Sequence, residues 1–234
     1  MSAICAYAWS EQIPMKLYSY FRSSASYRVR IALNLKGMPY DTVPVHLLKH
    51  GGEQLSQMYR TLNSDGLVPT MVDDDAVDGQ AVLTQSLAIL EYLEEIHPAP
   101  ALLPPAALDR AFVRSIALSI ACDIHPLNNL RVLRYLVHEL KVDENAKNAW
   151  YRHWCESGLA ALEVTLARDS RPGKFCFGDT PTLADCCLVP QIFNAQRLKC
   201  DLSAMPTVMG IYQNCQQLDA FSKAAPENQP DAEA

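Results

Sequence analysis

A single change of hydrophobic pattern between residues 16 and 37 predicts a β-strand that runs directly into an α-helix. Residues 16–21, KLYSYF, are rich in aromatic side chains, which favour short strands. From residue 27 to residue 35, apolar side chains recur at helical spacing on two faces, so this helix is expected to pack on both sides. Gly37 then supplies the residue type that ends many helices. Several serines, with Ser23 the first, lie at the junction of the two elements.

Three more short segments complete a small predicted sheet. Residues 40–47 predict a second strand, and Pro44 indicates that this strand lies at an edge, because proline cannot donate to a neighbouring strand. Residues 67–72 and 81–84 predict two further strands, which an acidic turn connects. The aspartates of this turn lack the twelve-residue ligand spacing of a calcium loop, so we interpret the turn as a solvated hairpin.

A strongly periodic helix follows the last strand. Its apolar residues are expected to face inward and Glu91, Glu94 and Glu95 to face solvent. Ser86, at the start of this helix, is a natural N-cap. The segment from residue 97 to residue 105 then contains four prolines, which end the helix and predict an irregular connection.

Beyond this connection only helical patterns remain. They cover residues 108–137 with a bend at Pro126, residues 143–169, residues 182–198 and residues 206–217. Thr182 and Asp185 have the spacing of a capping box, so we assign Asp185 to folding and not to chemistry. The sequence therefore predicts an α+β domain over residues 15–98 and an all-α domain over residues 106–226.

The two ends of the chain are expected to be disordered extensions. Residues 1–14 lack the basic start of a signal peptide and include Glu11, and Met15 is an alternative start. Residues 227–234 are polar and lack large apolar side chains. Neither segment is expected to contribute to the core.

Composition limits the classes of partner. The formal net charge of −6 argues against a general nucleic-acid or anionic-membrane binder, because both attract basic surfaces. No apolar run approaches the roughly 18 residues that a membrane span needs. The eight cysteines form no CxxC pair and no zinc-site spacing, so we expect free thiols in a reducing cytoplasm and no metal site.

Serines at a helix N-terminus have two interpretations. They can cap the unpaired N–H groups of the first turn, which is the commoner role for a single hydroxyl. They also lie where the helix dipole favours an anion, so a bound anionic group would meet a hydroxyl donor there. Spacing alone favours capping for Ser23.

The string SSASYRVRIALNLKG, which begins at Ser23, resembles the N-terminal signature of the zeta-class glutathione transferases. The usual core of that signature is Ser-Ser-Cys-x-aromatic-Arg-Val-Arg-Ile-Ala-Leu, and this chain differs at Ala25, where many members have cysteine. The resemblance implies a thioredoxin-like N-terminal domain, an all-α C-terminal domain and an active cleft between them. It also implies that Ser23 faces the sulfur of glutathione, with Ser24 and Arg22 as the other catalytic residues.

Further matches imply a set of glutathione-binding residues. In the first domain these are Gln54, Val68, Pro69, Gln85 and Ser86. Sequence alone favours a trans peptide before Pro69, but the resemblance implies a cis peptide that frees the preceding backbone to pair with glutathione. The segment DIHPLNNLR is similar to that of bacterial zeta-class members and implies contacts from His125 and Asn129. By itself, a histidine beside a helix bend is more often a hydrogen-bonded core residue.

Three arginines complete the implied site. Arg22, Arg131 and Arg197 match positions that face the substrate in the family, and arginine suits the recognition of a dianionic small molecule. Without the resemblance, Arg197 would be interpreted as a solvated residue near the C-terminus of a helix.

The resemblance implies a glutathione-dependent cis–trans isomerase that is a homodimer. The family includes maleylacetoacetate isomerase, which acts in the catabolism of tyrosine and phenylalanine through homogentisate. The alternatives are a maleylpyruvate isomerase of gentisate degradation, a general glutathione transferase and a non-catalytic binding protein with this fold. No nucleic acid or membrane partner is expected.

Overall fold

The computed structural model describes residues 15–77 and 79–233, so residues 1–14 and their expected disorder lie outside it. A four-stranded sheet organises the first domain, with β1 (Met15–Ser19), β2 (Asp41–Pro44), β3 (Thr70–Asp73) and β4 (Ala81–Thr84). The strand order is β2-β1-β3-β4, where β2 is parallel to β1 and the other neighbours are antiparallel. The βαβ unit, the hairpin and the edge position of β2 are thus confirmed.

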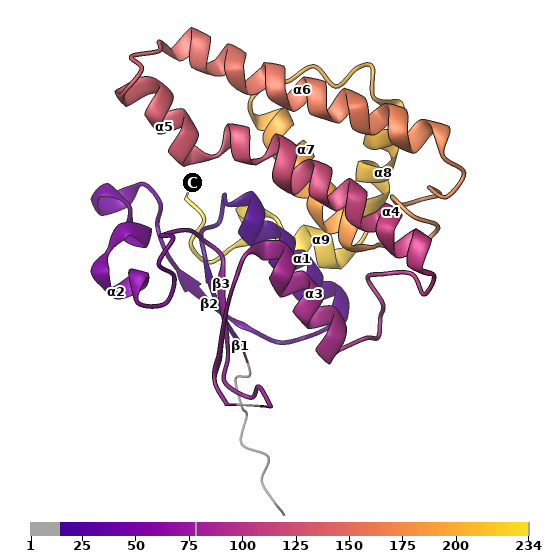
Figure 1. Cartoon of the computed structure of the whole chain (residues 1–234), viewed down its shortest axis with the longest axis horizontal. Helices are drawn as coiled ribbons and strands as arrows, with labels where there is room; N and C mark the ends of the chain where they lie inside the picture. The colour runs from indigo at the N-terminus through magenta and orange to yellow at the C-terminus, as the bar shows by residue number, and fades with distance from the viewer. Residues whose placement is uncertain (1–14, 78, 234) are drawn as a thin grey trace, which may run out of the picture.

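Two long helices pack beside this sheet in Figure 1. Helix α1 (Ser24–Lys36) follows β1 and ends at Gly37, whose φ of 65° is the left-handed value that glycine adopts readily. Helix α3 (Ser86–Ile96) follows β4. Between β2 and β3 lie two 3₁₀ turns, η1 (Lys49–Gly51) and η2 (Glu53–Leu55), and the short helix α2 (Gln57–Arg60).

Two expectations for α3 were wrong. Ser86 is its first helical residue and Gln85 occupies the N-cap position without a side-chain capping bond. Glu94 is buried and pairs with Lys36 of α1 at 2.7 Å between Oε2 and Nζ. Glu94 also accepts hydrogen bonds from the backbone N–H groups of Leu102 and Leu103. Helical periodicity could not show this, because the linker covers a face that α3 alone would leave in water.

The second domain is helical throughout, which confirms the predicted class. Helix α4 (Ala107–Leu118) continues through a π turn, η3 (Ser119–Ile124), and a 3₁₀ turn, η4 (Pro126–Asn128), into α5 (Leu130–His138). The predicted interruption at Pro126 is confirmed. The remaining elements are α6 (Glu144–Arg168), α7 (Leu183–Arg197), α8 (Pro206–Gln216), α9 (Asp219–Ala224) and the turn η5 (Pro226–Asn228). Among the described residues, no helix is both long and apolar enough to cross a membrane.

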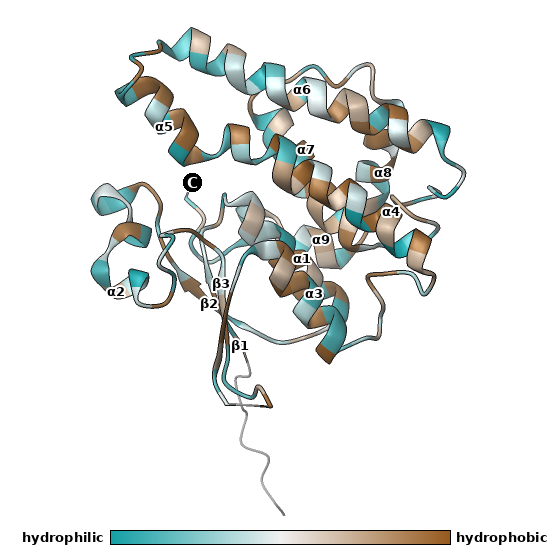
Figure 2. Ribbon diagram, viewed as in Figure 1, coloured by the Kyte–Doolittle hydropathy of each residue, from teal (hydrophilic) through white to brown (hydrophobic). Residues whose placement is uncertain are grey.

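One large core joins the two domains, and Figure 2 shows hydrophobic residues concentrated where α1, α4 and α7 meet. Helix α7 is buried along most of its length. Its predicted capping box is confirmed, because Asp185 Oδ2 accepts from the backbone N–H of Thr182 at 2.7 Å and from its hydroxyl at 2.9 Å. Asp185 therefore serves the fold of the helical domain.

The C-terminal tail is ordered up to residue 233, in contrast to the expected disorder from residue 227. Asp231 Oδ2 accepts from the backbone N–H of Phe21 at 3.0 Å, and Glu233 Oε1 accepts from Lys49 Nζ at 2.5 Å. The polar composition suggested disorder, but it could not show that the first domain offers donors for these carboxylates.

Candidate active site

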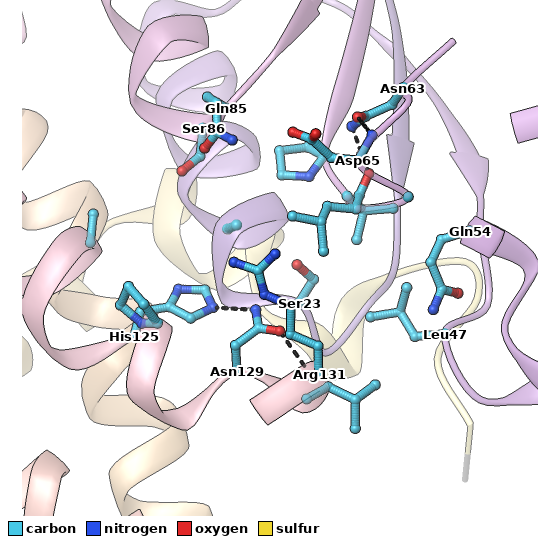
Figure 3. A pocket seen from close by; sticks show the side chains of 18 of the residues that line it. Ser23, Leu47, Gln54, Asn63, Asp65, Gln85, Ser86, His125, Asn129 and Arg131 are labelled. Carbon is cyan, nitrogen blue, oxygen red and sulfur yellow. Dashed lines mark hydrogen bonds between the residues drawn. The ribbon is translucent and has the colours of Figure 1, made fainter. Parts of the chain in front are cut away.

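A cleft of about 430 Å³ lies between the two domains. The first domain contributes the start of α1, the η2 region, the loop before β3 and the start of α3, and the second contributes the segment from η3 to α5. Figure 3 shows Ser23 near the centre of this site, with His125 on one side and Gln54 on the other. The structure brings every predicted glutathione-binding residue into this cleft: Ser23, Gln54, Val68, Pro69, Gln85, Ser86, His125 and Asn129.

A smaller cleft of about 210 Å³ adjoins the first. The two share wall residues, namely Ser23, Leu47, His125, Asn129 and Leu130. Ser24, Arg22 and Arg197 line only the smaller cleft, whereas Arg131 lines only the larger one. The three predicted substrate arginines are therefore divided between two adjoining spaces.

Ser23 combines the two interpretations of its hydroxyl. It is the N-cap of α1, and its Oγ accepts from the backbone N–H of Ser26 at 3.2 Å. Accepting this bond leaves the hydroxyl proton free, because a serine hydroxyl is both donor and acceptor. The half-buried side chain borders both clefts. Ser23 can thus cap the helix and donate a hydrogen bond to a bound anion at the same time.

Ser24 is buried and is tied to the second domain. Its Oγ accepts from Asn194 Nδ2 at 2.5 Å, and Asn194 Oδ1 accepts from Nε and Nη2 of Arg197, each at 3.4 Å. The amide of Asn194 therefore bridges a hydroxyl and a guanidinium in the smaller cleft. Asn194 was not predicted as a site residue; its only indication in the sequence is its position close to Arg197 on a largely apolar helix.

The peptide between Val68 and Pro69 is cis, as the resemblance implied. Across the cleft, Gln54 is buried and its Oε1 has no hydrogen-bond partner among the described residues. A buried acceptor of this kind costs free energy unless a ligand N–H pairs with it. This arrangement fits glutathione, a tripeptide with amide and amino donors.

The start of α3 lies at an end of the larger cleft that is suited to bind an anion. Gln85 has a φ of 66°, and non-glycine residues held in this region are often found at ligand sites. Ser86 follows it at the positive end of the helix dipole, and its Oγ accepts from Arg28 Nη1 at 3.2 Å. A ligand carboxylate placed here would meet helix N–H groups and a nearby guanidinium.

His125 borders both clefts and is neutral. Loss of hydration on burial, followed by the charges of Arg28 and Arg131, lowers its pKa to about 3. Arg28 Nη2 lies 2.8 Å from His125 Nδ1, and Asn129 Nδ2 lies 3.4 Å from His125 Nε2, the contact drawn in Figure 3. Asn129 also caps α5, since its Oδ1 accepts from the backbone N–H of Arg131 at 3.1 Å.

Three further charged residues line the larger cleft but were not predicted from the sequence, namely Arg28, Asp65 and Arg134. Arg28 carried a signal, because a charged residue within the apolar faces of a packed helix needs a polar partner. Asp65 and Arg134 lie in a turn and on an exposed helix, where charged residues are common. Among residues 15–77 and 79–233, no group of three or more His, Cys, Asp or Glu side chains is placed to hold a metal ion.

Comparison with known proteins identifies the architecture. The family model for the glutathione S-transferase N-terminal domain matches residues 22–96, and that for the C-terminal domain matches residues 148–206. A probable maleylacetoacetate isomerase of Vibrio cholerae is 49% identical over 92% of this chain and 97% of its own length. The maleylpyruvate isomerase of a Ralstonia species is also 49% identical, over 93% of this chain and 100% of its own.

Solved structures agree with these relatives. The holo structure of a bacterial maleylpyruvate isomerase, a glutathione S-transferase of the zeta class, matches with a TM-score of 0.88 at 49% identity, over 93% of this chain and 100% of that one. A maleylacetoacetate isomerase of Methylobacterium extorquens with bound malonate and glutathione also matches with a TM-score of 0.88, at 39% identity over 94% and 100% of the two chains. The chain therefore belongs to the zeta class of the glutathione S-transferase family.

Proposed function

We propose that this protein is a glutathione-dependent cis–trans isomerase that converts maleylacetoacetate to fumarylacetoacetate in the catabolism of tyrosine and phenylalanine. The observation that carries the proposal is the pair of adjoining clefts. One holds the residues that fit glutathione, and the other combines Ser24 with Arg22 and Arg197 for an anionic substrate. Ser23 lies at the boundary of the two, where sulfur and substrate would meet.

Bound glutathione supplies the sulfur nucleophile that makes the cis double bond transiently single and leaves after rotation. Ser23 stabilises the anionic form of that sulfur. Lowering a thiol pKa of about 8.5 by ~2 units needs ~2.7 kcal/mol of preferential stabilisation. The dipole of α1 gives only about 0.3–1 kcal/mol, whereas a hydrogen bond to a charged acceptor gives about 1.5–3 kcal/mol. The hydroxyl of Ser23 therefore outweighs the dipole.

The residues of the smaller cleft would hold the substrate and the charge that develops on it. Because Ser24 Oγ already accepts from Asn194, its proton is free to donate to a substrate oxygen. Arg22 and Arg197 are exposed to this cleft and form no ion pair among the described residues. Their planar guanidinium groups suit carboxylates. Arg131 lines only the larger cleft, together with the residues that fit glutathione.

A second candidate substrate is maleylpyruvate, because the Ralstonia enzyme is as similar to this chain as the Vibrio protein. The test is the loss of enolate absorbance of each cis substrate with and without glutathione. We expect maleylacetoacetate to give the higher kcat/KM, and only with glutathione present. A preference for maleylpyruvate would assign the protein to gentisate degradation. Conjugation without isomerisation would indicate a general transferase, and inactivity on all substrates a binding protein.

Ala25 lines the larger cleft at the position where many zeta-class members have cysteine. Addition to a conjugated alkene needs one sulfur anion, a stabilised enolate oxygen and anchored carboxylates, and none of these requires a protein thiol. We therefore expect Ala25→Cys to change the isomerisation rate by less than about tenfold, equivalent to ~1.4 kcal/mol. An inactive natural protein that Ala25→Cys activates would show that a protein thiol is required.

The assembly is proposed to be a homodimer. Apolar side chains on β4, α3 and α4 are exposed, namely Val82, Ile96, Leu108 and Leu118. A twofold contact over these elements would remove them from water. Light scattering at micromolar concentration is expected to give about twice the 26.0 kDa chain mass. A mass near that of one chain would contradict the proposal.

The cytoplasm is the proposed location. Among the described cysteines none forms a disulfide, and five are buried: Cys155, Cys176, Cys186, Cys187 and Cys215. Free thiols are stable in a reducing compartment.

A further inference from the structure

Arg28 is a buried cation that lies beside the larger cleft without a carboxylate partner. It belongs to α1 and is only 3% exposed. Among the described residues it forms no ion pair, and burial lowers the pKa of its guanidinium, which the thiols of Cys187 and Cys122 offset only in part. Its Nε is also buried without a hydrogen-bond partner there. Burial of an unpaired charge is costly, so a functional reason for Arg28 is expected.

The remaining nitrogens of Arg28 connect three segments around the cleft. Nη1 donates to Ser86 Oγ at the start of α3, and Nη2 lies 2.8 Å from His125 Nδ1 where η3 meets η4. A guanidinium has five N–H donors and no acceptor, and it stays protonated in proteins. The contact at 2.8 Å therefore requires that His125 Nδ1 presents a lone pair. Its proton must then reside on Nε2.

On the other side of the imidazole, Nε2 has no hydrogen-bond acceptor among the residues that the structure describes. Asn129 Nδ2 lies 3.4 Å from His125 Nε2, which is at the limit of a hydrogen bond. The Oδ1 of Asn129 is engaged with the backbone N–H of Arg131, and this bond fixes the orientation of the amide. The amide therefore presents its NH₂ group to His125, and two donors face each other. An acceptor oxygen from a ligand in the cleft would satisfy both.

We propose that Arg28 is a positioning residue that holds His125 as the neutral Nε2–H tautomer, so that Nε2–H and the amide of Asn129 together bind a carbonyl or carboxylate oxygen of the ligand in the larger cleft. The proposal rests on the function above only in taking that ligand to be glutathione. The low pKa of His125 agrees with it, since a neutral imidazole is needed to accept from Arg28.

Arg30, two residues further along α1, provides the matched comparison. It is fully buried as well, but each of its three nitrogens donates a hydrogen bond within the protein, to Ala224 O, Ser19 Oγ and Phe21 O. Arg30 thus has a structural role between the first domain and α9. Arg28 differs because its shortest hydrogen bond, at 2.8 Å, is to the titratable ring of His125, which borders both clefts.

The first test measures the tautomer directly in the ligand-free protein. Long-range proton–nitrogen NMR at pH 7 is expected to show His125 with a bare Nδ1 and a protonated Nε2. In Arg28→Met the ring is expected to populate both tautomers, and its pKa to rise toward the ordinary value of about 6.5. The control Arg30→Lys is expected to lower the melting temperature but to leave the tautomer unchanged. A wild-type ring protonated at Nδ1 would overturn the proposal.

The second test measures glutathione binding by calorimetry. Arg28→Met is expected to weaken binding by about tenfold or more, and Arg28→Lys to restore part of the loss. In a His125→Gln background, removal of Arg28 is expected to cost much less, because the two residues act as a unit. If the losses of glutathione affinity caused by the Arg28 and His125 substitutions were additive in the double variant, the proposal would be overturned. If Arg28→Met does not fold, the proposal is still tested by the tautomer of His125 in the natural protein and by glutathione binding of Arg28→Lys. Neither test needs isomerase activity, so a failure of the proposed reaction would be seen separately.

Discussion

Arg197→Met is expected to lower kcat/KM for the dianionic cis substrate by about 10²–10⁴-fold, because a bidentate carboxylate contact contains two charge-assisted hydrogen bonds of about 1.5–3 kcal/mol each. Arg197 is exposed to the smaller cleft, and its side chain contacts only Asn194 Oδ1, at 3.4 Å, among the described hydrogen bonds. Most of its donors are therefore available to a substrate. The measurement is steady-state kinetics at saturating glutathione.

Two further variants separate recognition from general electrostatics. Arg197→Lys keeps the charge but loses the planar fork, so we expect it to recover only a small part of kcat/KM. Arg168→Met removes an exposed arginine at the end of α6, outside both clefts, and is expected to have wild-type kinetics. Wild-type kcat/KM for Arg197→Met, or equal losses in both methionine variants, would remove Arg197 from the substrate site.

Sequence patterns predicted the elements that depend on local physics. The strand before Ser23, the helix end at Gly37, the edge position of Pro44 and the capping box at Thr182 each follow from neighbours in the chain. The cis peptide before Pro69 did not follow from such rules. It came from the resemblance, because local energetics favour trans.

The missed features depend on contacts between distant segments. Glu94 was expected to face solvent and residues 227–234 were expected to be disordered, yet distant partners bind Glu94 and, in the tail, Asp231 and Glu233. Asn194 was missed for the same reason, because its role depends on a hydrogen bond to Ser24, 170 positions away in the chain. Arg28 became interpretable only when His125, 97 positions away, was placed beside it. Hydrophobic periodicity describes one helix or strand at a time and cannot predict contacts between residues that are far apart in the chain.

Ser23→Ala is expected to lower kcat by about 10–150-fold, since it removes one hydrogen bond to the sulfur anion worth about 1.5–3 kcal/mol. Glutathione affinity is expected to change much less, because the other contacts to the tripeptide remain. Ultraviolet titration of bound glutathione should show a thiol pKa that is higher in the variant than in the natural protein. Ser23 lies at the start of α1 and is its N-cap, so Ser23→Ala is also expected to lower the stability of the protein.

Loss of the cap alone is expected to cost about 1 kcal/mol of stability, and a control must reproduce that cost without touching the site. Asp143 caps α6 by accepting from the backbone N–H of Ala146 at 2.8 Å and lies outside both clefts. Asp143→Ala should therefore lower the melting temperature with full activity, whereas Ser23→Thr, which keeps hydroxyl and cap, should retain a low thiol pKa. An unchanged thiol pKa and full activity in Ser23→Ala would leave Ser23 with the capping role only, and the sulfur anion would then depend on the helix dipole and the arginines.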